Sequence, residues 1–303
     1  MAGTGIFQPF DPDAREPRRR RFRPISVRVL LPNLVTLLAL SAGLTAIRMA
    51  LEARMDIAVY AIVAAAVLDG IDGRLARLLK GTSRFGAELD SLADFVDFGV
   101  APAIVLYVWT LSDLGSLGWI GALVFAIAAA LRLARFNIGL DAPKPPAFAL
   151  DYFVGVPAPA GAIVGLLPVY CGELASLGFP VVSATAALVY VVVIAALMVS
   201  RFPSWSFKRT TARIDRDWVV PLMLLAVLII GLLVSYPWQV LLIGSLAYLA
   251  ALPPAWVQWR RQAEADQRAR AAAATGPAGL GPPALPLPPT EGDGPREEGQ
   301  SLH

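Results

Sequence analysis

The sequence predicts an all-α protein, a polytopic membrane helical bundle of about eight transmembrane helices. Three observations predict it: the apolar composition, the length of the apolar runs, and the scarcity of charge inside them. Hydrophobic residues make up 56% of the 303 positions, charged residues make up 16%, and mean hydropathy is +0.61. Soluble globular domains contain more charge and shorter apolar runs. We therefore expect an integral membrane protein.

The apolar runs define the expected spans, because a helix needs roughly 20 apolar residues to cross a bilayer. They lie at residues 29–50, 57–79, 87–111, 117–139, 155–173, 180–200, 217–235 and 237–257. A Ser-Tyr-Pro turn at 235–237 separates the last two, and the Pro-Ala-Pro-Ala run at 157–160 is expected to break the start of the fifth. The transmembrane domain is therefore predicted at 27–261.

Two polar segments flank that domain. Residues 1–26 are polar and Arg-rich, and residues 262–303 form an Ala-, Pro- and Gly-rich tail that we expect to be disordered. The arginines concentrate beside apolar runs, as topology signals do, and we expect no nucleic-acid partner.

Basic residues indicate the orientation, because Lys and Arg accumulate in cytoplasmic loops. With the N-terminus in the cytoplasm, the loops after the second, fourth, sixth and eighth spans are the basic ones. The segments on the opposite side, at 112–116, 172–178 and 235–237, contain no Lys or Arg. Only Arg48 and Arg54 fall on that side and do not fit the expected orientation. We therefore expect a multi-pass protein of the cell inner (cytoplasmic) membrane, with both termini on the cytoplasmic side.

One polar cluster, at residues 69–97, interrupts the apolar sequence. Asp69, Asp72 and Arg77 fall on one face of a helix, and Gly86, Asp90 and Asp94 fall on one face of the next. A short loop between the two makes them antiparallel neighbours, so the carboxylate faces can meet.

Cations are needed where several carboxylates converge in a medium of low dielectric constant. Two divalent ions with a preference for oxygen ligands, Mg²⁺ or Mn²⁺, would satisfy the predicted site. The competing interpretation is a structural ion-pair network with Arg74 and Arg77, although four acids outnumber two arginines. Cys171 is the only cysteine, which excludes an internal disulfide and a multi-Cys metal site. His303, the only histidine, is the last residue of a polar tail, which argues against a histidine base in the core. A base would therefore be a carboxylate.

These residues resemble the signature of the CDP-alcohol phosphatidyltransferase family, and they match each of its specified positions: Asp69, Asp72, Gly73, Ala76, Arg77, Gly86, Asp90 and Asp94. The resemblance implies that Asp69, Asp72 and Asp90 bind metal and that Asp94 completes the metal shell or acts as the catalytic base. It implies that the other four residues, Gly73, Ala76, Arg77 and Gly86, contact the cytidine diphosphate. It also implies a homodimer. The orientation indicated by the basic residues, not the resemblance, places the active site in the cytoplasmic half of the membrane. Asp97 is a further acid to which we assign no metal role.

Four segments, one of which overlaps the end of the signature, resemble the bacterial integral-membrane phosphatidylserine synthase branch of this family. They are residues 32–36, 90–103, 131–137 and 153–161. The resemblance implies CDP-diacylglycerol as donor, L-serine as acceptor and CMP as leaving group. Arg132, Arg135 and Asn137 are candidates for binding the acceptor or the donor phosphate, because a bidentate arginine suits a carboxylate. The positive-inside rule places arginines there equally well.

Three alternatives share some of these features. Another acceptor alcohol, such as choline, glycerol phosphate or an inositol phosphate, would keep the chemistry. An intramembrane prenyltransferase would need two separate Asp-rich motifs, whereas the sequence contains one such cluster. A cation transporter would use the aspartates as an ion pathway but would leave the glycine and Ala-Arg positions unexplained.

Overall fold

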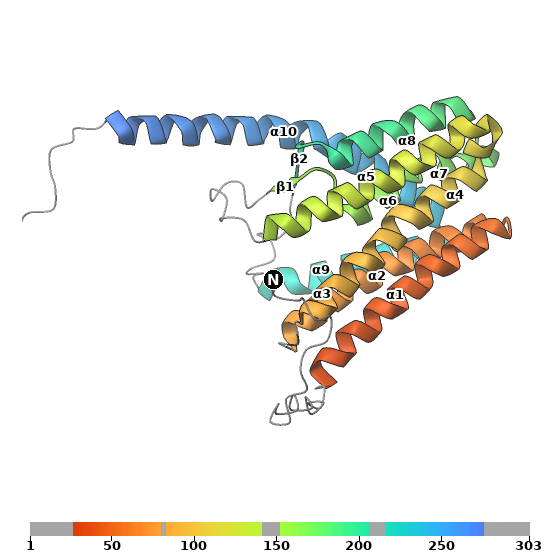
Figure 1. Cartoon of the computed structure of the whole chain (residues 1–303), viewed down its shortest axis with the longest axis horizontal. Coiled ribbons are helices and arrows are strands. Elements are labelled where there is room, and N and C mark those ends of the chain that lie inside the picture. The colour runs from red at the N-terminus through yellow and green to blue at the C-terminus, as the bar shows by residue number, and fades with distance from the viewer. Residues whose placement is uncertain (1–26, 80, 82, 141–151, 206–215, 276–303) are drawn as a thin grey trace, which may run out of the picture. The chain divides into compact units, whose positions relative to one another are not determined.

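The computed structural model describes residues 27–79, 81, 83–140, 152–205 and 216–275 (Figure 1). The first half contains α1 (Val27–Leu51), α2 (Met55–Leu78), α3 (Arg84–Phe95), the π-helical turn η1 (Val96–Val100), α4 (Ala101–Trp109), the 3-10 turn η2 (Leu111–Leu114) and α5 (Ser116–Leu140). The second half contains β1 (Tyr152–Val154), α6 (Ala158–Gly165), α7 (Leu167–Glu173), η4 (Ala175–Leu177), α8 (Ala184–Val199), β2 (Pro203–Trp205), α9 (Arg216–Ser235) and α10 (Pro237–Thr275). The predicted all-α class is confirmed.

Each expected span corresponds to helical structure. Five described stretches are long and apolar enough to cross a membrane: Leu30–Leu51, Arg84–Trp109, Ser116–Gly139, Trp218–Ser235 and Pro237–Arg268. The α6–α7 segment and α8 are apolar but shorter. The remaining helix, α2, has 24 residues and contains the charged cluster. The chain is an integral membrane protein.

Helix α1 packs along α2 and also contacts α3, η1 and α4 (Figure 1). Small side chains make this close packing possible: Ala46 and Ala50 of α1 and Ala58 and Ala65 of α2 are fully buried. Lipid tails are as apolar as leucine, so helices in membranes associate through such close contacts rather than through the hydrophobic effect. Helix α1 therefore forms a fixed support for the two helices that contain the aspartates.

The fifth span is interrupted, but not where the sequence analysis expected. Helix α6 begins directly after Pro157, so the Pro-Ala-Pro-Ala run starts a helix, as proline does well in a first turn. The interruption lies at Leu166, because Pro168 has no N–H to donate to the Val164 carbonyl. The Tyr190 hydroxyl of α8 donates to Val164 O instead, at 2.8 Å, and the Tyr170 hydroxyl donates to Ile163 O at the same distance. The backbone groups freed by the break are thus satisfied inside the bundle.

A two-stranded antiparallel sheet, which the sequence analysis did not predict, joins the segments that precede α6 and follow α8. Phe153 pairs with Ser204, and the Ser204 hydroxyl donates to Gly155 O at 2.9 Å. Gly155 has φ +77, and a Cβ there would lie 2.6 Å from the Met198 carbonyl oxygen, so only glycine fits. The sheet thus fixes the start of α6 beside the end of α8.

The predicted boundary of the C-terminal tail at residue 262 is wrong, because α10 continues to Thr275. The run after residue 261 is rich in Ala and also contains Gln and Arg, all good helix formers, and Glu264 Oε2 lies 3.8 Å from Arg268 Nη2 one turn later. Of the described residues, those of α10 from Val257 onward belong to a second unit, apart from the unit that contains the other helices. The N-terminal segment at 1–26 and the rest of the tail at 276–303 lie outside the described residues.

Candidate active site

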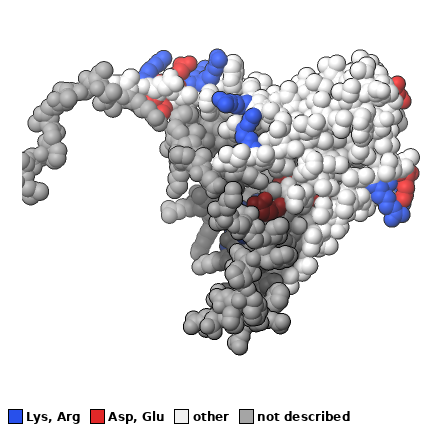
Figure 2. Space-filling view, in the orientation of Figure 1, with Lys and Arg blue, Asp and Glu red and all other residues white. Residues whose placement is uncertain are grey.

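Three carboxylates meet where α2 faces α3. Asp69 and Asp72 lie one turn apart on α2, Asp90 projects from α3, and one ligand oxygen from each lies within 4.8 Å of the others. Asp94, one turn further along α3, interacts with Asp69. The spacing in the sequence therefore brings the predicted acids together as expected. Figure 2 shows acidic atoms set into a recess of a surface that is otherwise largely free of charged residues.

The cluster contains a surplus of negative charge. Asp72 is 3% exposed, and its Oδ1 atom has no hydrogen-bond partner. In the part of the chain that the structure describes, no ion pair joins Arg74 or Arg77 to these carboxylates, and both arginines are exposed. The interpretation as a structural ion-pair network is therefore not supported. Clustered carboxylate oxygens, one of them buried without a partner, fit a hard divalent cation.

Thr36 of α1 positions Asp72, a contact that the sequence analysis missed. Its hydroxyl lies 2.7 Å from Asp72 Oδ2 and 3.2 Å from the Pro32 carbonyl oxygen. A hydroxyl has one proton, and the shorter contact to a charged acceptor is the stronger one. The signal available in the sequence was the polar residues of the Pro-Asn-Leu-Val-Thr segment at 32–36, which interrupt an apolar run.

A pocket of about 350 Å³ adjoins the cluster, between α1, α2 and the start of α3. The four residues expected to contact the nucleotide, Gly73, Ala76, Arg77 and Gly86, all line it together with Asp72 and Asp90. A Cβ at Gly73 would meet nothing within 4 Å, so the absence of a side chain leaves open space there.

Gly86 has a different role from Gly73 in the same pocket. A Cβ at Gly86 would lie 2.7 Å from Asn33 Oδ1 of α1, and its N–H donates to the Ser83 hydroxyl at 2.9 Å. Ser83 is the N-cap of α3. Gly86 thus allows α1 to approach the first turn of α3, and the two glycines line the pocket from different helices.

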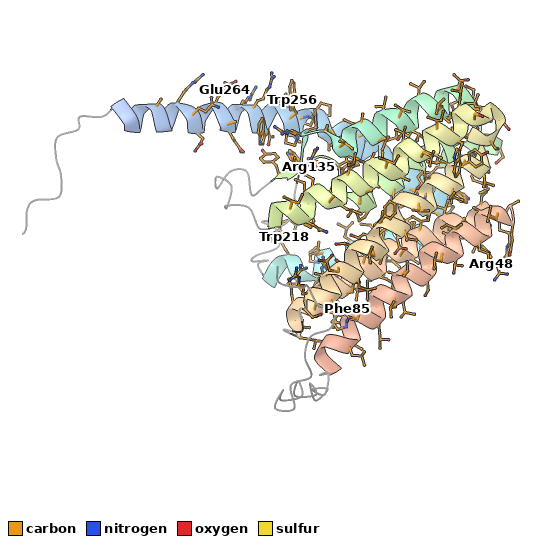
Figure 3. The ribbon with its side chains drawn as sticks, in the orientation of Figure 1. Arg48, Phe85, Arg135, Trp218, Trp256 and Glu264 are labelled. Atoms are coloured by element: carbon orange, nitrogen blue, oxygen red, sulfur yellow. The ribbon has the colours of Figure 1, made fainter. Side chains whose placement is uncertain are left out.

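The three candidates for acceptor binding occupy different surroundings. Arg132 is half-buried: its Nε donates to Val156 O at 2.9 Å, and its guanidinium lies 5.6 Å from the Phe136 ring centroid and near Asp94. Arg135 is exposed and donates to the Val199 carbonyl (Figure 3). The Asn137 side chain donates to the Ser91 hydroxyl of α3 at 3.0 Å. Of the three, Arg132 is the one that the structure places near a carboxylate of the site.

Figure 3 also shows which labelled residues lie at each end of the bundle. Arg48 lies at one end of α1, whereas Phe85 and Arg135 lie toward the opposite end. The Arg48 guanidinium pairs with Glu52 at 2.8 Å. Arg48, one of the two basic residues that do not fit the expected orientation, is therefore paired with an acid of the same helix region.

Comparison with known proteins gives two family matches. Residues 29–193 match the family described as CDP-alcohol phosphatidyltransferase, and residues 217–253 match CDP-alcohol phosphatidyltransferase 2. The first match contains all the residues of the carboxylate cluster and its pocket.

Individual relatives share one name, CDP-diacylglycerol–serine O-phosphatidyltransferase. The chain is 51% identical to the protein of Mycobacterium leprae over 152 residues, which is 50% of each chain. It is 51% identical to that of Mycobacterium tuberculosis (strain ATCC 25618 / H37Rv) over 154 residues, 50% of this chain and 52% of the relative. The protein of Helicobacter pylori (strain J99) is 35% identical over 236 residues, which is 75% of this chain and 90% of the relative. The matched region thus spans about half the length of the mycobacterial relatives.

Proposed function

Because this chain belongs to the CDP-alcohol phosphatidyltransferase family, we propose that it transfers the phosphatidyl group of CDP-diacylglycerol to the hydroxyl of L-serine. The products are phosphatidylserine and CMP. The observation that carries this proposal is the cluster of Asp69, Asp72 and Asp90 beside a pocket lined by small residues. The names of the relatives support serine as the acceptor.

The aspartates hold divalent metal in this proposal. Asp69, Asp72 and Asp90 are the ligands, and Asp94 lies beside Asp69. Two ions, Mg²⁺ or Mn²⁺, would neutralise the diphosphate and stabilise the attacking and leaving oxygens when bound. The hydrogen bond from Thr36 leaves Oδ1 of Asp72 available as a ligand, since it engages only Oδ2.

The cytidine diphosphate occupies the pocket between α1, α2 and α3. Gly73 and Ala76 leave room for a flat base and ribose, and Arg77, exposed at the rim, can bind a phosphate through two N–H groups. The diacylglycerol part of the donor extends into lipid, because the pocket lies within helices that cross the membrane.

Asp94 acts as the base. The serine hydroxyl oxygen attacks the phosphatidyl phosphorus, a new P–O bond forms, and the bond from that phosphorus to the CMP oxygen breaks. The proton of the hydroxyl passes to Asp94, which can reach a nucleophile placed next to Asp69 and Asp90. A carboxylate is the available base, because the only histidine of the chain is His303 at the end of the tail.

Arg132 is the acceptor residue that the geometry favours. Its Nε donates to Val156 O, and its Nη groups bind the serine carboxylate near Asp94 in this proposal. Arg135 and Asn137 act indirectly in this proposal, because Arg135 donates to α8 and Asn137 donates to α3. They hold α5 at the position that places Arg132.

The membrane arrangement follows from the distribution of charge. We place both termini and the active site on the cytoplasmic side of the inner membrane, where serine and CMP are soluble. A homodimer is proposed on the resemblance to the family, and membrane lipids surround the apolar exterior of the helices. The alternatives remain another acceptor alcohol, a prenyltransferase and a cation transporter.

The test is CMP release by the purified protein with CDP-diacylglycerol and Mn²⁺. Serine, choline, inositol phosphate and glycerol 3-phosphate are supplied separately, with Asp94→Asn as the catalytic variant and Asp113→Asn, an exposed acid in η2, as the matched control. We expect turnover with serine alone, lost in Asp94→Asn and retained in Asp113→Asn. Turnover with a different alcohol would refute the acceptor. Binding of labelled CDP-diacylglycerol without CMP release from any acceptor would refute the reaction, and failure to bind it would favour the transporter.

A further inference from the structure

Asp97 is a buried acid that the proposed reaction does not use. It lies in the π-helical turn η1, it is 1% exposed, and its Oδ1 atom has no hydrogen-bond partner among the described residues. Single π-helical turns occur frequently at functional sites. A buried carboxylate without a partner is costly in a protein interior and more so at membrane depth, where no solvent competes. Such a carboxyl group must be neutralised, either by a bound proton or by a nearby cation.

Helix α1 packs closely against the Asp97 carboxylate. Gly43 of α1 faces it so closely that a Cβ at that position would overlap Asp97 Oδ1. Helices α1, α2, α5 and α6 all pack against η1. The absence of a side chain at residue 43 therefore creates the space in which the carboxylate lies.

Among the described residues, acids of the candidate metal site interact electrostatically with Asp97. Asp97 interacts electrostatically with Asp69 and Asp72 on α2 and with Asp94 on its own helix. Asp90, Asp94 and Asp97 follow one another at i, i+4 and i+7, so Asp97 continues the same helix face one turn deeper into the bundle. No ion pair between described residues neutralises it.

We propose that Asp97 is a positioning residue of the metal centre, a fifth carboxylate whose charge strengthens the binding of divalent cations by the aspartates above it. This inference rests on the proposed function, because it assumes that those aspartates bind metal. Gly43 holds the Asp97 carboxylate at the distance from which it acts on the ions. Asp97 itself need not touch substrate.

The test measures binding of Mn²⁺ alone to the purified full-length protein in detergent, by the loss of the free-ion electron paramagnetic resonance signal. Asp97→Asn preserves size and removes the charge, and Asp113→Asn removes the same charge from an exposed position. Because Asp97→Asn removes a negative charge that attracts a divalent ion bound by the neighbouring aspartates, we expect it to raise the Kd for Mn²⁺ by at least about 10-fold. Asp113→Asn should bind as the wild type does. A Kd for Asp97→Asn within about twofold of the wild-type value overturns the proposal.

A second pair of variants tests whether Gly43 acts through the carboxylate. Gly43→Ala displaces Oδ1 and should weaken Mn²⁺ binding when residue 97 is Asp but have no further effect in the Asp97→Asn background. Gly244→Ala, at a glycine with nothing within 4 Å of the added Cβ, is the control. Equal weakening by Gly43→Ala in both backgrounds would assign the effect to helix packing and overturn the proposal. If Asp97→Asn does not fold, Gly43→Ala against Gly244→Ala decides alone, and equal Kd values overturn the proposal.

The outcome is separable from that of the proposed function. Mn²⁺ binding that depends on Asp97, in a protein that releases no CMP with any acceptor, would refute the reaction and retain the fifth carboxylate. CMP release with serine, together with Mn²⁺ binding that does not depend on Asp97, would support the proposed reaction and refute the role of Asp97.

Discussion

Two regions of this bundle bury polar groups, and they treat them in opposite ways. At the break between α6 and α7, the carbonyls of Ile163 and Val164 accept hydrogen bonds from the Tyr170 and Tyr190 hydroxyls, each at 2.8 Å. Between α2 and α3, the carboxylates meet one another, and Oδ1 of Asp72 has no partner. A satisfied group stabilises a fold, whereas a group left unsatisfied in a membrane interior is retained for a ligand. The presence or absence of a hydrogen-bond partner thus distinguishes buried polar groups that stabilise the fold from those that we expect to bind a ligand.

The largest expected effect concerns the unsatisfied region. Asp90→Asn removes a metal ligand while preserving side-chain volume, and we expect CMP release with serine to fall at least about 1000-fold, because a missing ligand removes stabilisation of the transition-state charge. Initial rates at saturating Mn²⁺ measure it. Glu88→Gln, an exposed acid on the same helix, is the control. A rate for Asp90→Asn within tenfold of wild type would mean that the cluster is not the reaction centre.

A smaller effect is expected when a larger side chain narrows the pocket. Gly73→Val should raise the KM for CDP-diacylglycerol about 10-fold or more, because the added methyl groups occupy open space beside Asp72 rather than displace protein. Gly231→Val tests the same substitution at a glycine of α9 that also has open space around it. Thermal stability should be unchanged in both, and a loss of stability in Gly73→Val with an unchanged KM would contradict the assignment of the pocket.

Removing the Thr36 hydroxyl tests how far its hydrogen bond positions Asp72. Thr36→Val deletes the hydrogen bond to Asp72, and we expect kcat/KM to fall about 10-fold and stability to fall by about 1–2 kcal/mol, since the buried carboxylate loses one positioning contact. Steady-state kinetics at several Mn²⁺ concentrations and a thermal melt provide the two readouts. Thr45→Val, at an exposed threonine of the same helix, is the matched control. A melting temperature that falls while the rate holds would reassign Thr36 to structure.

The smallest effect belongs to the satisfied region. Tyr190→Phe leaves the Val164 carbonyl without its donor and should destabilise the protein by about 1 kcal/mol, because buried hydrogen bonds in membrane proteins contribute modestly. Equilibrium unfolding in mixed micelles measures it, and kcat should be unaffected. Loss of activity without loss of stability would show that this region also serves the reaction.

The fold and the centre of the site were predictable because they depend on local periodicity. Eight apolar runs predict the helices, and spacings of three and four residues place Asp69 with Asp72 and Asp90 with Asp94. A short connection then brings the two pairs together. The extension of α10 was missed because composition was used to place the tail, although the Ala- and Arg-rich run after residue 261 favours a helix.

The remainder depends on contacts between residues far apart in the chain. Thr36 and Asp72 are separated by 36 positions, Arg132 and Val156 by 24, and Asn137 and Ser91 by 46. A side chain expected to bind a ligand can instead donate to a backbone carbonyl, and the sequence pattern is the same in both cases. Arg132 donates to Val156 O through Nε, and Arg135 donates to the Val199 carbonyl. Sequence periodicity identifies which face a residue occupies but not which partner it meets there.

The most direct test of the central claim is a Mn²⁺ titration of thermal stability, comparing wild type with Asp90→Asn. If the carboxylates are unsatisfied until cations bind, Asp90→Asn should melt higher than wild type without metal, because one of several like charges has been removed. Saturating Mn²⁺ should reverse that order, since ligand binding stabilises the wild type by about 3–4 kcal/mol at concentrations far above its Kd. A wild type that is the more stable of the two without metal, and that gains nothing from Mn²⁺, would contradict the account.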